Sequence, residues 1–238
     1  MSAPLEVALI EIRVRDLDVA LAFYRDVFGW GTLVATPTMV YVDTGQPPLV
    51  CLMVDDRMPL GVGNNCVVDE LSAVLDRCRA LGGRIVIEGQ GGGPFAGTLD
   101  PWGNELFFWQ PTVARPRHRS SRTHPLVFLE IATPDFVAAQ HYYAELCGWS
   151  FWERVGARGF ATADGCGFPG GIALTRASTH GTRNYVEVAS LDAIMTKLVV
   201  HDVFMSAPFE LAWGGRFAVF ADRDGNRLGL YEPDGAVH

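Results

Sequence analysis

Several features are scarce in this 238-residue sequence, and each scarcity narrows what the chain can be. Basic residues number 19 against 27 acidic ones, and the net charge of −8 argues against nucleic acid as a partner. No apolar run approaches the ~18 residues that a membrane span needs, and the first residues lack the basic segment and long apolar core of a signal peptide. We therefore expect a cytoplasmic protein with no membrane partner.

Cysteine pairs and catalytic motifs are also lacking. The five cysteines are odd in number and form no C-x-x-C pair, so we interpret them as reduced, mostly buried thiols. A G-x-G-x-x-G sequence at 165–170 leads into GIALT, which predicts a strand where a dinucleotide-binding loop needs a helix. No Ser-His-Asp or Cys-His arrangement stands out in the sequence.

What the chain does contain is an internal repeat. Asp16-(x7)-Tyr24-(x5)-Trp30 recurs at an offset of 119 as Asp135-(x7)-Tyr143-(x5)-Trp149. A second pair, DPWGNELFFW from Asp100 and DRDGNRLGLY from Asp222, is offset by 122. Self-similarity at a fixed offset indicates one structural unit used twice. We predict a domain at 1–110, a linker at 111–125 and a second domain at 126–238.

Each half contains the same order of elements twice. Residues 7–14 alternate in hydropathy and predict a strand, and Asp16 is a plausible N-cap for a helix that Gly29 ends. Three short strands follow before the pattern restarts. Further helices are expected at 70–81, 135–147 and 190–201, the last one opened by Ser190. The prediction is an α+β fold of four βαβββ modules, joined by a basic stretch that we interpret as a solvated linker.

The modules and both motifs resemble the vicinal oxygen chelate superfamily, which includes glyoxalase I, bleomycin- and fosfomycin-resistance proteins and extradiol dioxygenases. The resemblance covers about 7–110 and 126–232. It implies two tandem glyoxalase-like domains, whose mixed sheets curl around clefts with the helices outside. Fold does not settle chemistry, so the function has to come from the residues in those clefts.

Metal-dependent members of this superfamily hold a divalent ion with His, Glu or Gln on the first and last strands of their modules. By register from the loop motifs, the corresponding positions here carry Leu9, Phe107, Phe128 and Gly229, and Arg183 stands on the opening strand of module four. Hydrocarbon side chains cannot coordinate an ion, and a guanidinium repels one. The six histidines lie in the linker, on helices, in a loop or at the terminus. We therefore expect no metal and no other cofactor.

Strand parity predicts which side chains face the clefts, because alternate residues point to opposite faces. Rings and aliphatic groups dominate this set and favour a small aromatic or polycyclic ligand. The expected ligand-binding residues are Leu9, Arg13, Phe107, Trp109, Phe128, Tyr185, Arg227 and Tyr231.

Three carboxylates share those inward faces, namely Glu11, Glu130 and Glu187. A carboxylate on an apolar strand is costly to bury unless it is paired or protonated. One interpretation makes these residues general acids or bases; the other gives them a structural role, for example through a hydrogen bond to Arg13.

Two functions therefore stay open, and a third, weaker hypothesis is a metal enzyme whose ligands stand in another register. The first is metal-free binding of an aromatic molecule in secondary metabolism or drug resistance. The alternative is a metal-independent isomerase, cyclase or dehydratase acting on a polyketide-like substrate. Whether the protein is an enzyme, and whether it is a monomer or a homodimer, the sequence does not decide.

Overall fold

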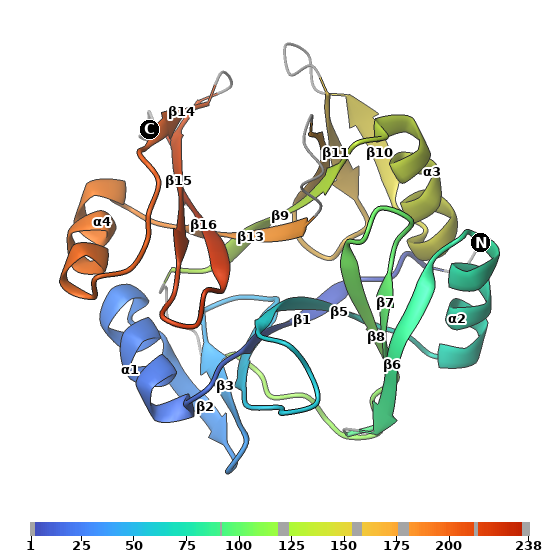
Figure 1. Ribbon diagram of the computed structural model, residues 1–238, viewed down its shortest axis with the longest axis horizontal. Coiled ribbons are helices and arrows are strands. Elements are labelled where there is room, and N and C mark those ends of the chain that lie inside the picture. The colour runs from blue at the N-terminus through green and yellow to red at the C-terminus, as the bar shows by residue number, and fades with distance from the viewer. Residues whose placement is uncertain are drawn as a thin grey trace. The chain divides into compact units, whose positions relative to one another are not determined.

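The computed structural model describes residues 3–90, 92–118, 124–153, 159–175, 181–211 and 214–234. Within them the order strand, helix, three strands occurs four times, as the sequence predicted (Figure 1). Modules one and two contain β1 (Val7–Arg13), α1 (Leu17–Phe28), β2 (Gly31–Ala35), β3 (Met39–Asp43), β4 (Leu49–Met53), β5 (Gly61–Val67), α2 (Leu71–Ala80), β6 (Arg84–Gln90), β7 (Pro94–Leu99) and β8 (Glu105–Trp109).

Modules three and four repeat this order in the second half of the chain. They contain β9 (Leu126–Thr133), α3 (Phe136–Cys147), β10 (Ser150–Glu153), β11 (Phe160–Asp164), β12 (Gly170–Leu174), β13 (Gly181–Glu187), α4 (Leu191–Val200), β14 (Phe209–Glu210), β15 (Arg216–Ala221) and β16 (Arg227–Glu232). No helix in the described parts of the chain is long and apolar enough to cross a membrane.

Each half of the sequence forms one mixed, eight-stranded sheet. The strand orders are β2-β3-β4-β1-β5-β8-β7-β6 and β10-β11-β12-β9-β13-β16-β15-β14. β5 runs parallel to β8, and β13 runs parallel to β16. On their other sides, β8 pairs with β7 and β16 pairs with β15, both antiparallel. Neither order closes on itself, so the sheets are open. The predicted α+β fold of two tandem glyoxalase-like domains is confirmed.

α1, α3 and α4 each begin after a residue whose side chain caps the first turn. The carboxylate of Asp16 accepts hydrogen bonds from the backbone N–H groups of Asp18 and Val19, and the hydroxyl of Ser190 accepts one from Ala193. Gly29 follows α1 with φ of 72°, a left-handed conformation that glycine adopts without steric cost. These local signals are readable in the sequence, which explains why the helix positions were predictable.

By contact density the chain divides into two compact units that combine modules from both halves. One consists of Met1–Leu9, Gly63–Arg115 and Phe128–Thr182, and we call it the 2–3 unit after its modules. The other consists of Ile10–Val62, Pro116–Val127 and Arg183–His238, and we call it the 1–4 unit. α1 packs on α4 in the 1–4 unit, and α2 packs on α3 in the 2–3 unit (Figure 1). The boundaries at 110 and 126 stay a prediction.

The two repeated motifs meet inside each unit. In the 1–4 unit, the carboxylate of Asp222 accepts the hydroxyl of Tyr24 at 2.8 Å and the backbone N–H of Asn226 at 2.8 Å. Tyr24 stacks on Trp30, whose indole N–H donates to the carbonyl of His124. The 2–3 unit repeats the arrangement with Asp100, Asn104, Tyr143, Trp149 and the carbonyl of Leu5. The motifs therefore join the modules within each unit.

Candidate functional site

The predicted residues on β1 are buried. Leu9, Glu11 and Arg13 expose 8%, 8% and 3% of their surfaces, and the alternate residues Ile10 and Ile12 are fully buried on the other face. The guanidinium of Arg13 lies 3.5 Å from the carboxylate of Glu11 and donates from Nε to the carbonyl of Pro59 at 2.7 Å. The contact favours the structural interpretation of Glu11, which remains a prediction.

Glu11 belongs to a polar cluster on module one, together with side chains of β3 and β4. Burial, then the charges of Cys51 and Glu11, raise the pKa of Tyr41 to about 12. Burial and the charge of Glu11 also raise the pKa of the Cys51 thiol. Tyr41 pairs directly with Cys51 across the two strands. Both groups therefore stay protonated at neutral pH, and neither is a ready nucleophile.

Aromatic side chains cover one face of the module-four strands. Glu187 pairs with Tyr231, Tyr231 with Phe217, and Phe217 with Phe209, so these four residues stand side by side across β13, β16, β15 and β14. Residues paired across neighbouring strands project from the same face. Phe209 and Phe217 stack with ring centroids 5.3 Å apart, and Phe217 meets Tyr185 edge-on at 6.3 Å. We call Tyr185, Tyr231, Phe217 and Phe209 the ring row.

Glycine makes room for two of these rings. A Cβ atom on Gly229 would stand 2.2 Å from Cδ1 of Tyr185, so the ring lies directly on the glycine backbone. A Cβ atom on Gly215 would stand 2.8 Å from Cε2 of Tyr231. The ring of Tyr185 therefore occupies the space that any side chain at position 229 would need.

Polar groups flank the ring row. The guanidinium of Arg183 donates to the hydroxyl of Tyr185 at 3.4 Å, and Glu187 stands beside Tyr231 as its pairing partner. Arg227 is exposed. Phe209 and Phe217 were not predicted as site residues. The alternation in RFAVFA was a usable signal for Phe217, whereas β14, with only two residues, is too short to show a pattern.

A smaller aromatic pair lies on module three. Phe128 and Phe160 stack with centroids 5.9 Å apart, and both rings reach over Gly171, which pairs directly with Glu130. Phe128 and Glu130 are half-buried. Two of the predicted site residues therefore stand on one face here, at the position where a glycine opens space for rings.

The predicted rings of module two are more deeply buried. Phe107 and Trp109 on β8 expose 1% and 7% of their surfaces. Phe107 pairs with Gly97 and Trp109 with Phe95 on β7. A Cβ atom on Gly97 would stand 2.7 Å from the ring of Phe107. Module two thus repeats the combination of a ring and a glycine on adjacent strands.

The structure sorts the predicted site residues by unit. Within the 1–4 unit, Tyr185, Glu187 and Tyr231 share one strand face, and Glu11 contacts Arg13. The 2–3 unit holds Leu9 and two further sets: Phe107 with Trp109, and Phe128 with Glu130. Their roles as catalytic or ligand-binding residues stay predictions.

Among the described residues, no group of three or more His, Cys, Asp or Glu side chains is arranged to hold a metal ion. The histidines have other contacts. His118 lies 3.1 Å from Asp43, His124 lies 3.1 Å from the carbonyl of Glu187, and His201 at the end of α4 lies 2.7 Å from Asp26. His141 is exposed on α3. His180 and His238 fall outside the described residues, as do Arg119 and Arg122 of the linker.

Two other sequence interpretations are confirmed. The glycine motif at 165–170 leads into β12, a strand, so it is not a dinucleotide-binding loop. All five cysteines are free and buried.

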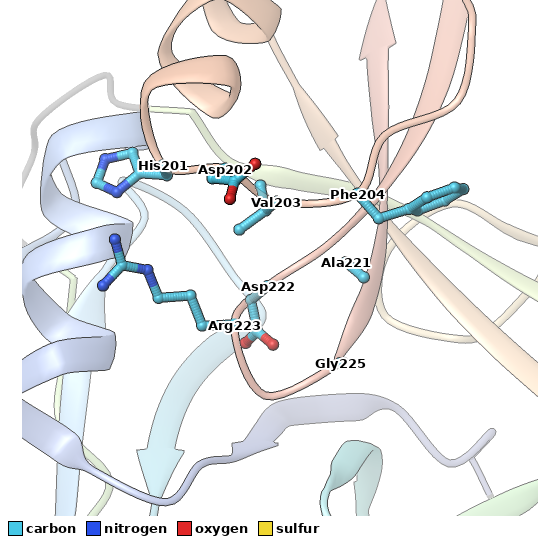
Figure 2. Close-up of a pocket in the computed structure, with 8 residues that line it drawn as sticks. All are labelled: His201, Asp202, Val203, Phe204, Ala221, Asp222, Arg223 and Gly225. Atoms are coloured by element: carbon cyan, nitrogen blue, oxygen red, sulfur yellow. The ribbon is translucent and has the colours of Figure 1, made fainter.

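An open pocket of about 600 Å³ lies in the 1–4 unit, outside the predicted site. Figure 2 shows His201 and Arg223 on the side of α1 and Phe204 on the opposite side, with Asp222 between them. The carboxylate of Asp222 accepts hydrogen bonds from the hydroxyl of Tyr24 and the side-chain amide of Asn226. This lining residue of the pocket therefore has a structural role.

Comparison with known proteins gives a family match for the first half of the chain. Residues 6–108 match the family described as Glyoxalase/Bleomycin resistance protein/Dioxygenase superfamily. No curated protein matches the sequence. An extradiol ring-cleaving dioxygenase from B. fuscum is similar in structure, with 17% identity, a TM-score of 0.67, and coverage of 98% of this chain and 73% of the other. The Mn(II)-bound glyoxalase from Novosphingobium aromaticivorans is 14% identical, with a TM-score of 0.64 and coverage of 98% and 83%. At these identities the likeness shows the fold alone.

Proposed function

We propose that this chain binds an aromatic or polycyclic small molecule without a metal ion. Residues 6–108 match the glyoxalase/bleomycin resistance protein/dioxygenase superfamily, and solved structures of a dioxygenase and a glyoxalase share the fold over 98% of the chain. The observation that carries the proposal is the ring row, in which Phe209 and Phe217 stack and Tyr185 meets Phe217 edge-on. Aromatic side chains offer large, rigid apolar surfaces, and an aromatic ligand stacks on them in the same geometries.

The side chains at the metal positions implied by the resemblance do not fit an ion. Leu9, Phe107 and Phe128 present hydrocarbon only. Position 229 is a glycine, and the ring of Tyr185 fills the space beside it. A ligand of this protein is therefore held by stacking and by hydrogen bonds to the groups that flank the rings, such as Arg183 and Glu187. Sequestration, drug resistance or transport of an intermediate of secondary metabolism are the roles that such binding would serve.

A panel of two-, three- and four-ring aromatic compounds, titrated by calorimetry, tests this function. Phe217→Leu removes the ring that contacts both Phe209 and Tyr185, and we expect it to weaken binding by about tenfold, since stacking is worth roughly 0.5–1.5 kcal/mol beyond area. Phe204→Leu makes the same exchange at an exposed ring outside the row and serves as the matched control. Equal loss in both variants, or no binding by any compound, would refute the proposal.

Metal-independent acid–base catalysis is the second candidate function. One observation favours it: Glu187 stands in the same cross-strand row as Tyr231, Phe217 and Phe209, so a carboxylate would lie at the edge of a stacked ligand. Glu187→Gln, with Glu11→Gln and Glu130→Gln alongside, separates the two functions. Variants that bind the ligand but lose turnover support the enzyme. Binding with no turnover by the wild type supports a binding protein.

A further inference from the structure

The strand face that carries the ring row also carries an exposed arginine. Arg227 opens β16, two residues before Gly229 and four before Tyr231. Because residues two and four apart on a strand point to the same side, the side chain of Arg227 projects from the ring-row face. Arg227 is exposed, so a ligand that lies on this face can reach it.

Arg227 has no carboxylate partner among the described residues. Two other arginines of the 1–4 unit do have one: Arg15 pairs with Asp224 at 2.8 Å, and Arg216 pairs with Glu232 at 2.9 Å. A guanidinium has N–H donors only, so whatever binds it must supply an acceptor. Its planar fork fits a carboxylate through two parallel hydrogen bonds, and this charge-assisted contact is stronger than a bond between neutral groups.

A second arginine stands at the same end of this face. Arg183 precedes Tyr185 by two residues on β13, and Tyr185 pairs with Gly229 on β16. Arg183 and Arg227 therefore stand two residues before one paired position, on neighbouring strands and on the same side of the sheet. The guanidinium of Arg183 donates to the hydroxyl of Tyr185 at 3.4 Å. An anion at this end of the face is attracted by two positive charges.

The surface between the arginines and the ring row is apolar. Val219 and Ala221 on β15 project from it, and Ala221 is the direct pairing partner of Arg227. The four residues from Arg227 to Tyr231 correspond to about 13 Å along the strand. A fused system of three aromatic rings with a substituent at its end covers that length. Its rings can therefore rest on the ring row while the substituent reaches Arg227.

There is open space beside Arg227 for such a substituent. Its pairing partner Ala221 is one of the residues that line the open pocket of about 600 Å³ (Figure 2). Ala221 is half-buried, so only a methyl group occupies the strand position next to Arg227. Arg183, Arg227 and the ring row all belong to the 1–4 unit, so this site is complete within one unit.

We propose that Arg227, assisted by Arg183, binds an acidic group at the edge of the ligand's ring system, so that the ligand class is an aromatic carboxylate rather than a neutral aromatic compound. Glu187 stands four residues after Arg183 on the same face, at the ring-row end. Its carboxylate repels an acid bound the other way round, so the two ends of the face set the direction of the ligand. The inference rests on the proposed function and adds the charge by which the site selects its ligand.

Anthracene-2-carboxylate and anthracene-2-carboxamide test this inference as a pair, because they share the ring skeleton and the shape of the substituent and differ in charge. We expect the carboxylate to bind the wild type more tightly in calorimetric titrations. Arg227→Gln should weaken carboxylate binding by about tenfold, the worth of one hydrogen bond to a charged group, and leave the carboxamide unchanged. Added salt should weaken the binding of the carboxylate only, because it screens the attraction between exposed charges.

Arg223→Gln is the matched control. It removes the same charge from another exposed arginine, in the loop between β15 and β16, and Figure 2 shows this side chain on the side of α1. Arg223→Gln should change neither affinity. An equal loss of carboxylate binding in Arg223→Gln and Arg227→Gln would overturn the inference, because the preference would then come from the net charge of the protein.

Two further results separate this inference from the proposed function. Equal affinity of the wild type for the two compounds, with both weakened by Phe217→Leu, overturns the inference and leaves the proposed function standing. If neither compound binds, the inference is overturned, and the panel of aromatic compounds with Phe217→Leu alone decides the proposed function.

Discussion

The hydroxyl of Tyr24 donates to the carboxylate of Asp222 at 2.8 Å, although 198 positions separate the two residues. Tyr24 belongs to the first repeated motif and Asp222 to the second, so the bond joins module one to module four. Burial, and then the charge of Asp222, hold the pKa of Tyr24 well above its usual value. Tyr143 and Asp100 make the equivalent bond, at 2.9 Å, between modules three and two. The repeated motifs are therefore the joints of the fold.

Removing that hydroxyl should destabilise the 1–4 unit. Tyr24→Phe leaves the buried carboxylate of Asp222 without one of its donors, and we expect a loss of about 1–3 kcal/mol in the free energy of unfolding, measured by urea titration. Tyr143→Phe should give a similar loss. Tyr41→Phe makes the same exchange at a half-buried phenol without a carboxylate bond and should cost less. A loss as large in Tyr41→Phe would contradict the role assigned to the motif.

Glycine 229 should tolerate no side chain. In Gly229→Ala the new Cβ atom would stand 2.2 Å from the Tyr185 ring, so the ring must move and the strand loses typically about 1–3 kcal/mol. Gly31→Ala is the control, because it lies in a strand with no atom within 4 Å of the added carbon. Thermal unfolding of both variants checks the difference. An unchanged melting temperature in Gly229→Ala would show that the Tyr185 ring does not rest on that backbone.

The cysteines should be unreactive in the folded protein. All five are free and buried, and burial raises the thiol pKa of Cys51, Cys147 and Cys166, which keeps them protonated. A thiol-specific disulfide reagent at pH 8 should label essentially none in the native protein and all five after denaturation. Rapid labelling of a native thiol would mean that one of the units opens easily.

The carboxylate of Glu232 should make folding stability sensitive to acid. It accepts the first backbone N–H of α4 at Leu191 and pairs with Arg216 at 2.9 Å, and these contacts lower its pKa. Because the pKa of Glu232 is lower in the folded state, its carboxylate stabilises the fold at pH values above the ordinary glutamate pKa of about 4.3. That stabilisation is lost as the pH falls from there through the lowered pKa of the folded state. Glu232→Gln should therefore be less stable at neutral pH and lose less on acidification. Glu145→Gln, at an exposed position, should follow the wild type.

The sequence predicted what depends on local signals and left open what depends on distant pairing. Asp16 and Ser190 cap helices as expected, because a cap needs only the next three residues. The sequence could not predict that Tyr24 pairs with Asp222, because Asp100 occupies the same position in the other copy of the second motif. The two phenylalanines of the ring row that went unpredicted lie on strands whose register is fixed by β16, and that register is a property of the folded sheet.

Position 229 shows the same limit within the site. The sequence identified Gly229 as a residue unable to bind an ion, but only the structure shows that the ring of Tyr185, from a neighbouring strand, lies on it. The lack of a carboxylate partner for Arg227 among the described residues likewise has no sequence signature, because it depends on what surrounds the guanidinium in the folded unit.

The central claim is that the ring row holds an aromatic ligand without a metal ion. Titration of the protein with an aromatic compound that it binds, before and after exhaustive removal of metal ions by a chelator, tests it directly. We predict the same dissociation constant under both conditions and a larger dissociation constant for Phe217→Leu. Binding that disappears on chelation and returns when a divalent metal is added would contradict it.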